Sequence, residues 1–214
     1  TGANLSSFDL SGFDLSGADL TGAILTGATL SSADLSDADL TGVSSGSITG
    51  TPTLPGGYSL VNGYIVGPNV NLINADLTGA TLTDVVSGQI IGAPTLPAAY
   101  TMVDGYIVGP TVDLTDAIFT AADLASSDLT DANLTSATLN NAVLTDAVLT
   151  GVDLTEADLT GATLTNVISG QILGTPTLPE AYSLIKGYVV GPGVVLTGAD
   201  LTDSGEPDTG LPET

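Results

Sequence analysis

Leucine recurs at every fifth position over long stretches of this chain. The first series consists of Leu5, Leu10, Leu15, Leu20, Leu25, Leu30, Leu35 and Leu40. The same spacing continues through residues 72–82, 114–164 and 196–201. A period of five matches neither the helical period of about 3.6 nor the two-residue alternation of a plain strand. It predicts a coil in which each unit of five residues contributes one short strand and one corner.

The position within each unit predicts which side chains point inward. The leucine and the residue two before it, usually alanine, fall on the same side of an extended segment. The Asp, Asn or Thr between them points outward, and Gly, Ser, Asp or Asn at the fifth place suits a corner. The predicted structural core is represented by Leu10, Leu20, Leu40, Leu77, Phe119, Leu134, Leu154 and Leu201.

Units such as ANLSS, FDLSG and ADLTG resemble the pentapeptide-repeat family, whose unit is written A(D/N)LXX. The resemblance implies an all-β fold, a right-handed quadrilateral β-helix with four units per coil. Such a solenoid is stabilised by contacts between neighbouring coils. Dividing the ladder positions by four gives about nine coils for this chain.

Three segments of equal length interrupt the five-residue series, at residues 43–72, 85–114 and 167–196. They share the sequence PTLP, a GY pair and a VGP sequence, and they contain all six tyrosines. Apolar residues recur at every sixth position, as in Ile48 and Leu54. We therefore expect the chain to keep coiling there, with sides of about six residues. The alternative is that each module loops out and packs on the rod. We expect the tyrosines to pack in the core or at its edge, rather than to form a carbohydrate platform.

The last residues differ in character from the repeats. We expect residues 1–203 to form one β-helix and the polar residues 204–214 to form a flexible tail. The terminal residues Leu211, Pro212, Glu213 and Thr214 resemble the sortase motif LPxTG of Gram-positive surface proteins, without its glycine. This resemblance implies a link to cell-wall peptidoglycan through Thr214; an added ligation tag is the alternative. Because Thr1 already lies within a repeat, we expect adjoining domains of a longer chain.

The charge balance limits the classes of partner. The chain has 24 acidic residues against a single base, Lys186, and a formal net charge of −23. Binding to nucleic acid needs Lys and Arg to neutralise phosphates, so neither nucleic acid nor an anionic membrane is an expected partner. No apolar run is long enough to span a membrane. Hydrophobic residues make up 43% of the chain, which argues against disorder.

The sequence lacks the residues that most catalytic sites require. It contains no His, no Cys and no Arg, and its Ser and Thr occupy positions set by the repeat. We therefore expect no enzyme activity, no cofactor and no metal site. Stacked carboxylates bind Ca²⁺ only loosely unless a dedicated loop arranges them.

These observations favour a structural function. We expect a stalk or spacer segment of an extracellular, cell-wall-anchored surface protein or adhesin of a Gram-positive bacterium. One alternative is an acidic DNA mimic that binds DNA gyrase, as some pentapeptide-repeat proteins do. A further alternative is ice binding through ladders of Thr, although Thr and Ser follow the leucines on all sides of the predicted coil.

Overall fold

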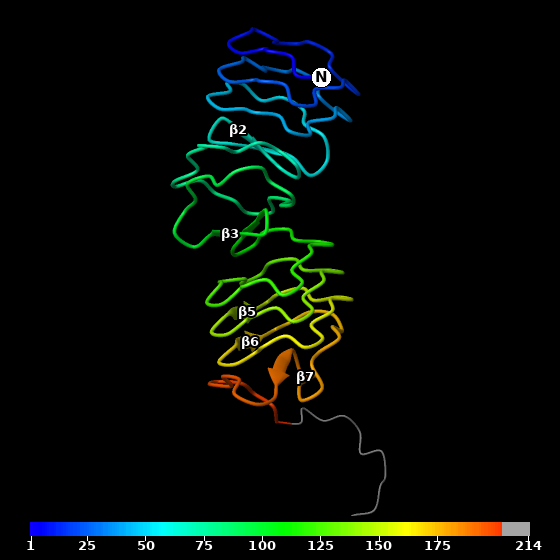
Figure 1. The fold of residues 1–214 in the computed structure, drawn as a ribbon, viewed down its shortest axis with the longest axis vertical. Coiled ribbons are helices and arrows are strands. Elements are labelled where there is room, and N and C mark those ends of the chain that lie inside the picture. The colour runs from blue at the N-terminus through cyan, green and yellow to red at the C-terminus, as the bar shows by residue number, and fades with distance from the viewer. Residues whose placement is uncertain (203–214) are drawn as a thin grey trace, which may run out of the picture.

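The computed structural model describes residues 1–202. The chain winds into a long rod of stacked coils, with the N-terminus at one end (Figure 1). No residue in the described part of the chain is α-helical. Most of the ladder is made of isolated β-bridges. The regular strands are β1 (Ser59–Val61), β2 (Tyr64–Val66), β3 (Thr101–Val103), β4 (Tyr106–Val108), β5 (Val148–Thr150), β6 (Ile168–Gly170), β7 (Ser183–Ile185) and β8 (Tyr188–Val190).

A fixed register relates each coil to the next. Asn4 pairs in parallel with Ile24, and Ile24 pairs in parallel with Ser44. Both steps span four units of the repeat, so the coil has four sides. Backbone hydrogen bonds close the ladder, as where the Ile24 amide donates to the Ala3 carbonyl at 2.9 Å. The predicted right-handed, four-sided β-helix is confirmed.

The number of coils follows from the rungs on one face. That face carries Asn4, Ile24, Ser44, Asn71, Ile91, Ile118, Thr138, Asp158 and Thr177. Bridges link the rungs from Asn4 to Ile91 and, separately, those from Ile118 to Thr177. Ile91 and Ile118 are as far apart in the sequence as Val86 and Asp113, which pair on the neighbouring face, so the two series lie on one face. One rung per coil gives nine coils, as the sequence predicts.

The rod interior is filled by the leucine and alanine positions of the repeat. Seven of the eight residues chosen to represent the core are buried: Leu10, Leu20, Leu40, Leu77, Phe119, Leu134 and Leu154. The expectation for Leu201 is wrong, because 36% of its surface is exposed. Leu201 lies at the end of the described residues, and no coil within them stacks on its far side. At the other end of the rod, Leu10 and Leu20 of the first coil are buried and Leu5 and Leu15 only partly so, and burial is most complete where coils stack on both sides.

The corners are tight turns with one residue in the left-handed region. The Ala28 amide donates to the Leu25 carbonyl at 3.0 Å, and Gly27 between them has φ of 71°. Asn and Asp tolerate this conformation better than most residues with a β-carbon. Asp131 takes the same place with φ of 56°. This is why Gly, Asn, Asp and Ser recur at the fifth position.

The three modules depart from the predicted six-residue sides. Ser44 pairs with Asn71, so this coil is more than one unit longer than the coil from Ile24 to Ser44. Three sides keep their rungs, at Ser44, Thr49 and Thr53. The fourth side is replaced by the antiparallel hairpin of β1 and β2. The expected six-residue ladder is thus wrong at this side, because an antiparallel hairpin accommodates the additional length of chain.

The other two modules repeat this arrangement. Strands β3 and β4 pair in the same register as β1 and β2, and so do β7 and β8. The second strand of each hairpin faces the interior, where Ile65, Ile107 and Val189 are completely buried. Each hairpin therefore closes its coil and adds to the core.

Candidate functional site

The outward acids of the rod hold its corners together. The Asp128 Oδ1 atom accepts hydrogen bonds from the Thr130 backbone amide at 3.0 Å and the Thr130 hydroxyl at 2.6 Å. Asp9 accepts the same two bonds from Ser11. Such turns, in which a carboxylate caps the backbone two residues on, are a local property of Asp and Asn. The Asp ladders are thus explained by the fold.

Hydrogen bonding keeps these carboxylates ionised. The side-chain hydrogen bond from Ser11 lowers the pKa of Asp9, and that from Thr160 lowers the pKa of Asp158. Asp14 pairs directly with Asp34 on the next coil, so like charges stack along the rod. The result is a surface that repels anions and other rods of the same charge.

No metal site emerges from these acids in the described part of the chain. Within residues 1–202, no three Asp, Glu, His or Cys side chains form a group that could hold a metal ion. A search of the same residues finds no helix with the length and apolar character needed to cross a membrane.

The tyrosines of the modules interlock with glycines. The Tyr58, Tyr100 and Tyr182 hydroxyls each donate to the carbonyl of the proline ten residues later, at 3.1, 3.3 and 3.0 Å. The other three tyrosines pack on the glycine of the SG pair: a β-carbon at Gly46 would lie 3.0 Å from the Tyr64 ring. The tyrosines therefore hold the hairpins in place, and their rings are not arranged as a carbohydrate platform.

The serine of each SG pair fastens the hairpin to the preceding side. The Ser45 hydroxyl oxygen accepts a hydrogen bond from the Ile65 amide at 2.8 Å. Ser87 makes the same bond to Ile107 at 2.6 Å, and Ser169 makes it to Val189 at 3.0 Å. The residues that the three modules share thus specify one local structure.

The hairpins lie on three different faces of the rod. The first module begins at Ser44, on the same line of rungs as Ile91, which is the second rung of the next module. The second module begins at Val86, which lies on the same line of rungs as Leu173, the second rung of the third module. Each module is therefore turned by one side relative to the one before. A single flat recognition face made of all three hairpins is excluded.

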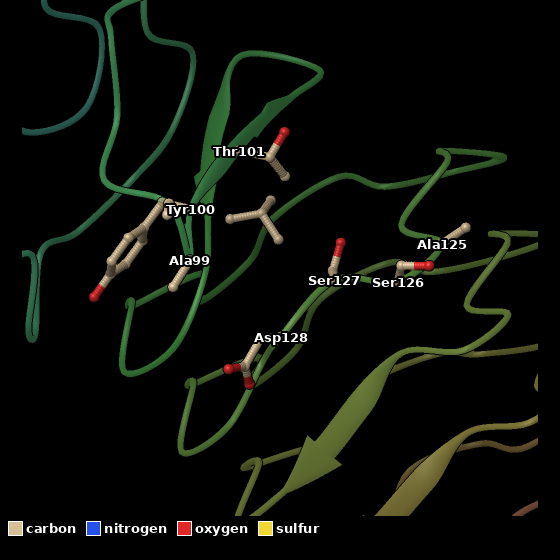
Figure 2. Close-up of a pocket in the computed structure, with 9 residues that line it drawn as sticks. Ala99, Tyr100, Thr101, Ala125, Ser126, Ser127 and Asp128 are labelled. Carbon is tan, nitrogen blue, oxygen red and sulfur yellow. The ribbon is translucent and has the colours of Figure 1, made fainter. Parts of the chain in front are cut away.

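Clefts lie beside the hairpins. One of about 460 Å³ is lined by Pro52, Leu54 and Tyr58, and its counterpart of about 450 Å³ by Pro176, Leu178 and Tyr182. A third, of about 310 Å³, lies between the second module and the coil that follows it (Figure 2). Its lining includes Ser127, which stands at an inward position where the repeat usually has alanine. That departure from the repeat is visible in the sequence, although it was not among the predicted site residues.

Two sequence features belong to the C-terminal end of the chain. Leu211, Pro212, Glu213 and Thr214 lie outside the described residues. Lys186 lies in the turn between β7 and β8, and its ammonium group donates to the Thr202 carbonyl. Lys186 therefore contacts the last of the described residues.

The comparisons with known proteins agree with the repeat pattern. The family model "Pentapeptide repeats" matches in eight copies, over residues 3–42, 112–135 and 127–166. A search of curated proteins finds no match.

Solved structures, two of which are described as pentapeptide-repeat proteins, are similar to this chain. The protein Rfr23 from the cyanobacterium Cyanothece 51142 is 21% identical with a TM-score of 0.25, over 81% of this chain and 89% of that chain. HetL from the cyanobacterium Nostoc sp. strain PCC 7120, involved in heterocyst differentiation regulation, is 22% identical with a TM-score of 0.28, over 94% and 92%. QnrB1, a plasmid-mediated fluoroquinolone resistance protein, is 18% identical with a TM-score of 0.28, over 84% of each chain. Residues 3–42 and 112–166, which form four-sided coils in the structure, thus match the family model of pentapeptide repeats.

Proposed function

We propose that this chain is a non-catalytic spacer, the stalk segment of an extracellular surface protein anchored to the cell wall of a Gram-positive bacterium. The observation that carries the proposal is the parallel ladder with its register of four units per coil, which recurs from Asn4 to Thr177. Stacking nine coils at about 4.8 Å each gives a rod of about 43 Å. Its length is set by the number of coils, which is the property that a spacer requires.

The chemistry of the rod surface supports the same function. Its acids are occupied in capping corners, as Asp128 does for Thr130, and are not grouped for chemistry within residues 1–202. A net charge of −23 keeps rods apart and soluble. A rod with such a surface holds neighbouring domains away from a charged wall and does not itself bind to the wall.

The attachment to the wall is proposed from the sequence of the tail. Leu211, Pro212, Glu213 and Thr214 match the first four positions of a sortase motif, after a polar segment that suits a flexible linker. In this proposal Thr214 is joined through its carboxyl carbon to an amine of the peptidoglycan, and a binding domain adjoins the other end of the rod.

The attachment is tested in cells that carry the native gene. Walls are digested with a muramidase, and the released protein is analysed by mass spectrometry. We expect a C-terminal peptide in which Thr214 carries a peptidoglycan fragment. A Pro212→Ala variant, as a matched control, should be recovered from the medium or membrane without this fragment. If Thr214 of the native protein never carries a wall fragment, the proposed anchoring is wrong.

The spacer function is tested by removing one complete coil. Deleting the segment 133–152 removes four whole units and so preserves the register between the coils on either side. We expect the rod to stay folded and surface binding to decline as coils are removed, independently of which coil is deleted. Unchanged surface binding, together with inhibition of gyrase supercoiling by the purified rod, would instead favour the DNA-mimic alternative.

A further inference from the structure

The cleft beneath the second module has a polar wall that includes Ser127 and Asp128. It lies between residues 98–101, which lead into β3, and residues 125–128 of the following coil, as Figure 2 shows. Its volume is about 310 Å³. Since each water molecule takes about 30 Å³ of liquid volume, this space is of the order of ten waters. A small organic molecule would fit it.

The first module provides an internal comparison, because it has the same pattern and the same length as the second. The places of Ser127 and Asp128 are taken there by Val85 and Val86. Val85 is buried, and the Val86 side chain lies 3.8 Å from where a β-carbon at Gly57 would be. Valine side chains thus pack beneath the first hairpin. Under the second hairpin Ser127 and Asp128 take their places and line the cleft.

Ser127 is the residue that points to a ligand. It takes an inward position held by Ala122 and Ala132 in the flanking units, and only 8% of its surface is exposed. Its backbone amide donates to the Leu124 carbonyl, and its carbonyl accepts from Val148. Its hydroxyl has no hydrogen-bond partner among residues 1–202, and it is reached by solvent from the cleft, because no buried side-chain N or O atom of these residues lacks a partner. The hydroxyl is therefore free to bond to a molecule that enters the cleft (Figure 2).

The charges around the cleft select the kind of ligand. The Asp128 Oδ1 atom is occupied by Thr130, and its second carboxylate oxygen has no partner within the described residues. The hydroxyls of Thr101 and Ser126 add further hydrogen-bonding groups, and no Lys or Arg lines the cleft. The Tyr100 ring turns away from Ser127 and donates to Pro110, so it offers no stacking surface (Figure 2). Such a cleft accepts N–H and O–H donors and repels anions.

We propose that the cleft formed by Thr101, Ser127 and Asp128 binds a small hydroxylated organic cation, a molecule of amino-sugar size with one primary ammonium group. The ammonium pairs with the free oxygen of Asp128. A ligand hydroxyl bonds to Ser127, and the exposed apolar surface of Ala98 and Ala99 contacts the carbon skeleton. This binding is independent of the stalk proposal, because it would stand if the wall anchoring failed.

The proposal is tested by NMR titration of the whole chain with three probes of equal size: glucosamine, glucose and gluconate. The buffer contains about 0.15 M salt, which screens diffuse attraction of cations to the rod. We expect glucosamine to shift the amides of Ala99, Ser127 and Asp128 in a saturable manner. Glucose should bind more weakly and gluconate not at all. The equivalent amides of Gly57, Val85 and Val86 in the first module should stay unchanged and serve as the control within each sample.

Two variants separate the cleft from the general charge of the rod. Ser127→Val keeps the charge and fills the cleft as Val85 does, and Asp128→Asn keeps the shape. Asp128→Asn should weaken glucosamine binding by about tenfold, the effect of one charge-assisted hydrogen bond, and Ser127→Val should weaken it by about tenfold through the lost hydroxyl and the space that valine takes up. Far-UV circular dichroism should show both variants folded. Equal binding of glucosamine and gluconate, equal shifts in the first module, or unchanged binding in Ser127→Val would each overturn the proposal.

Discussion

Gly109 lies against the ring of Tyr100 so closely that a β-carbon at position 109 would overlap the ring. The Tyr100 hydroxyl donates to the carbonyl of Pro110, the residue after Gly109, and this bond holds the ring against Gly109. The same relationship joins Gly67 to Tyr58 and Gly191 to Tyr182. The glycine of each VGP sequence is therefore required by a side-chain contact and not by an unusual backbone angle.

Substituting Gly109 by alanine should destabilise the second module. Because the φ of Gly109 is not in the left-handed region, the effect reports steric overlap with Tyr100 alone. We expect a loss of about 1–3 kcal/mol in the free energy of unfolding, as for other overpacked sites. Urea unfolding checks this. Gly56→Ala is the control: nothing lies within 4 Å of a β-carbon there, so its change should stay within about 0.5 kcal/mol. Equal effects of the two substitutions would refute the interlock.

The turn of the third hairpin offers a stabilising substitution. Lys186 has φ of 50°, and its counterparts Asn62 and Asp104 have φ of 48° and 49°. Asn tolerates the left-handed region better than Lys, for which the cost is roughly 1 kcal/mol. Lys186→Asn should therefore raise the melting temperature, and Asn62→Lys should lower it. The exposed contact from Lys186 to Thr202 contributes little against this. A lower melting temperature in Lys186→Asn would contradict the turn assignment.

Burial between two coils should govern the effect of leucine substitutions. Leu134 is buried with coils on both sides, so Leu134→Ala should cost about 2–5 kcal/mol through lost transfer energy and a cavity. Leu201 is exposed, and Leu201→Ala should change stability by less than about 0.5 kcal/mol. Both free energies are measured by chemical denaturation. A similar loss at the two sites would show that the far side of Leu201 is covered.

Acid should weaken the rod through its corner carboxylates. Side-chain hydrogen bonds hold the pKa of Asp9 and Asp158 below the ordinary value of 3.8. A carboxyl whose pKa is lowered in the folded state stabilises the fold above its unfolded pKa, and this contribution is lost as the pH falls through the folded pKa. We therefore expect the melting temperature to decline as the pH falls below about 3.8.

The Asp158→Asn variant tests the same cause at one corner. Asn fits this position, as Asn133 shows by accepting a hydrogen bond from the Thr135 amide at 3.0 Å. The variant should keep the turn and lose part of the pH dependence. A melting temperature that stays constant or rises from pH 4 to pH 2 would contradict the assignment for the whole set of corner acids.

Much of the rod could be predicted from the sequence because a solenoid repeats its local structure. The five-residue spacing of Leu35 and Leu40 contains the strand, the corner and the inward direction together. Every coil meets the same environment, so the core positions and the number of coils follow from counting. The exposure of Leu201 could not be predicted in this way, since the spacing describes a residue's own coil and not whether another coil covers it.

The turn residues of the hairpins predict a hairpin, although the six-residue apolar spacing favours a continuous side. Asn62 and Gly63 form a pair typical of two-residue hairpin turns, with φ of 48° and 78°, and Asp104 and Gly105 repeat it. Ile48 and Val66 nevertheless both point into the interior, so an apolar ladder is consistent with either structure. Periodicity alone could not decide between a six-residue side and a folded-back strand.

The sequence by itself determined the coil, because its period acts between residues that are neighbours along the chain. Only the tertiary structure decided what lies beneath each hairpin. Ser127 meets Thr101 across a cleft because the hairpin takes up the extra residues of the module, so that the following coil stacks on it in register. The face on which each hairpin lies depends on the number of five-residue units between modules. The residues below the second hairpin therefore differ from those below the first, although the two hairpins share their sequence pattern, because different coils stack below them.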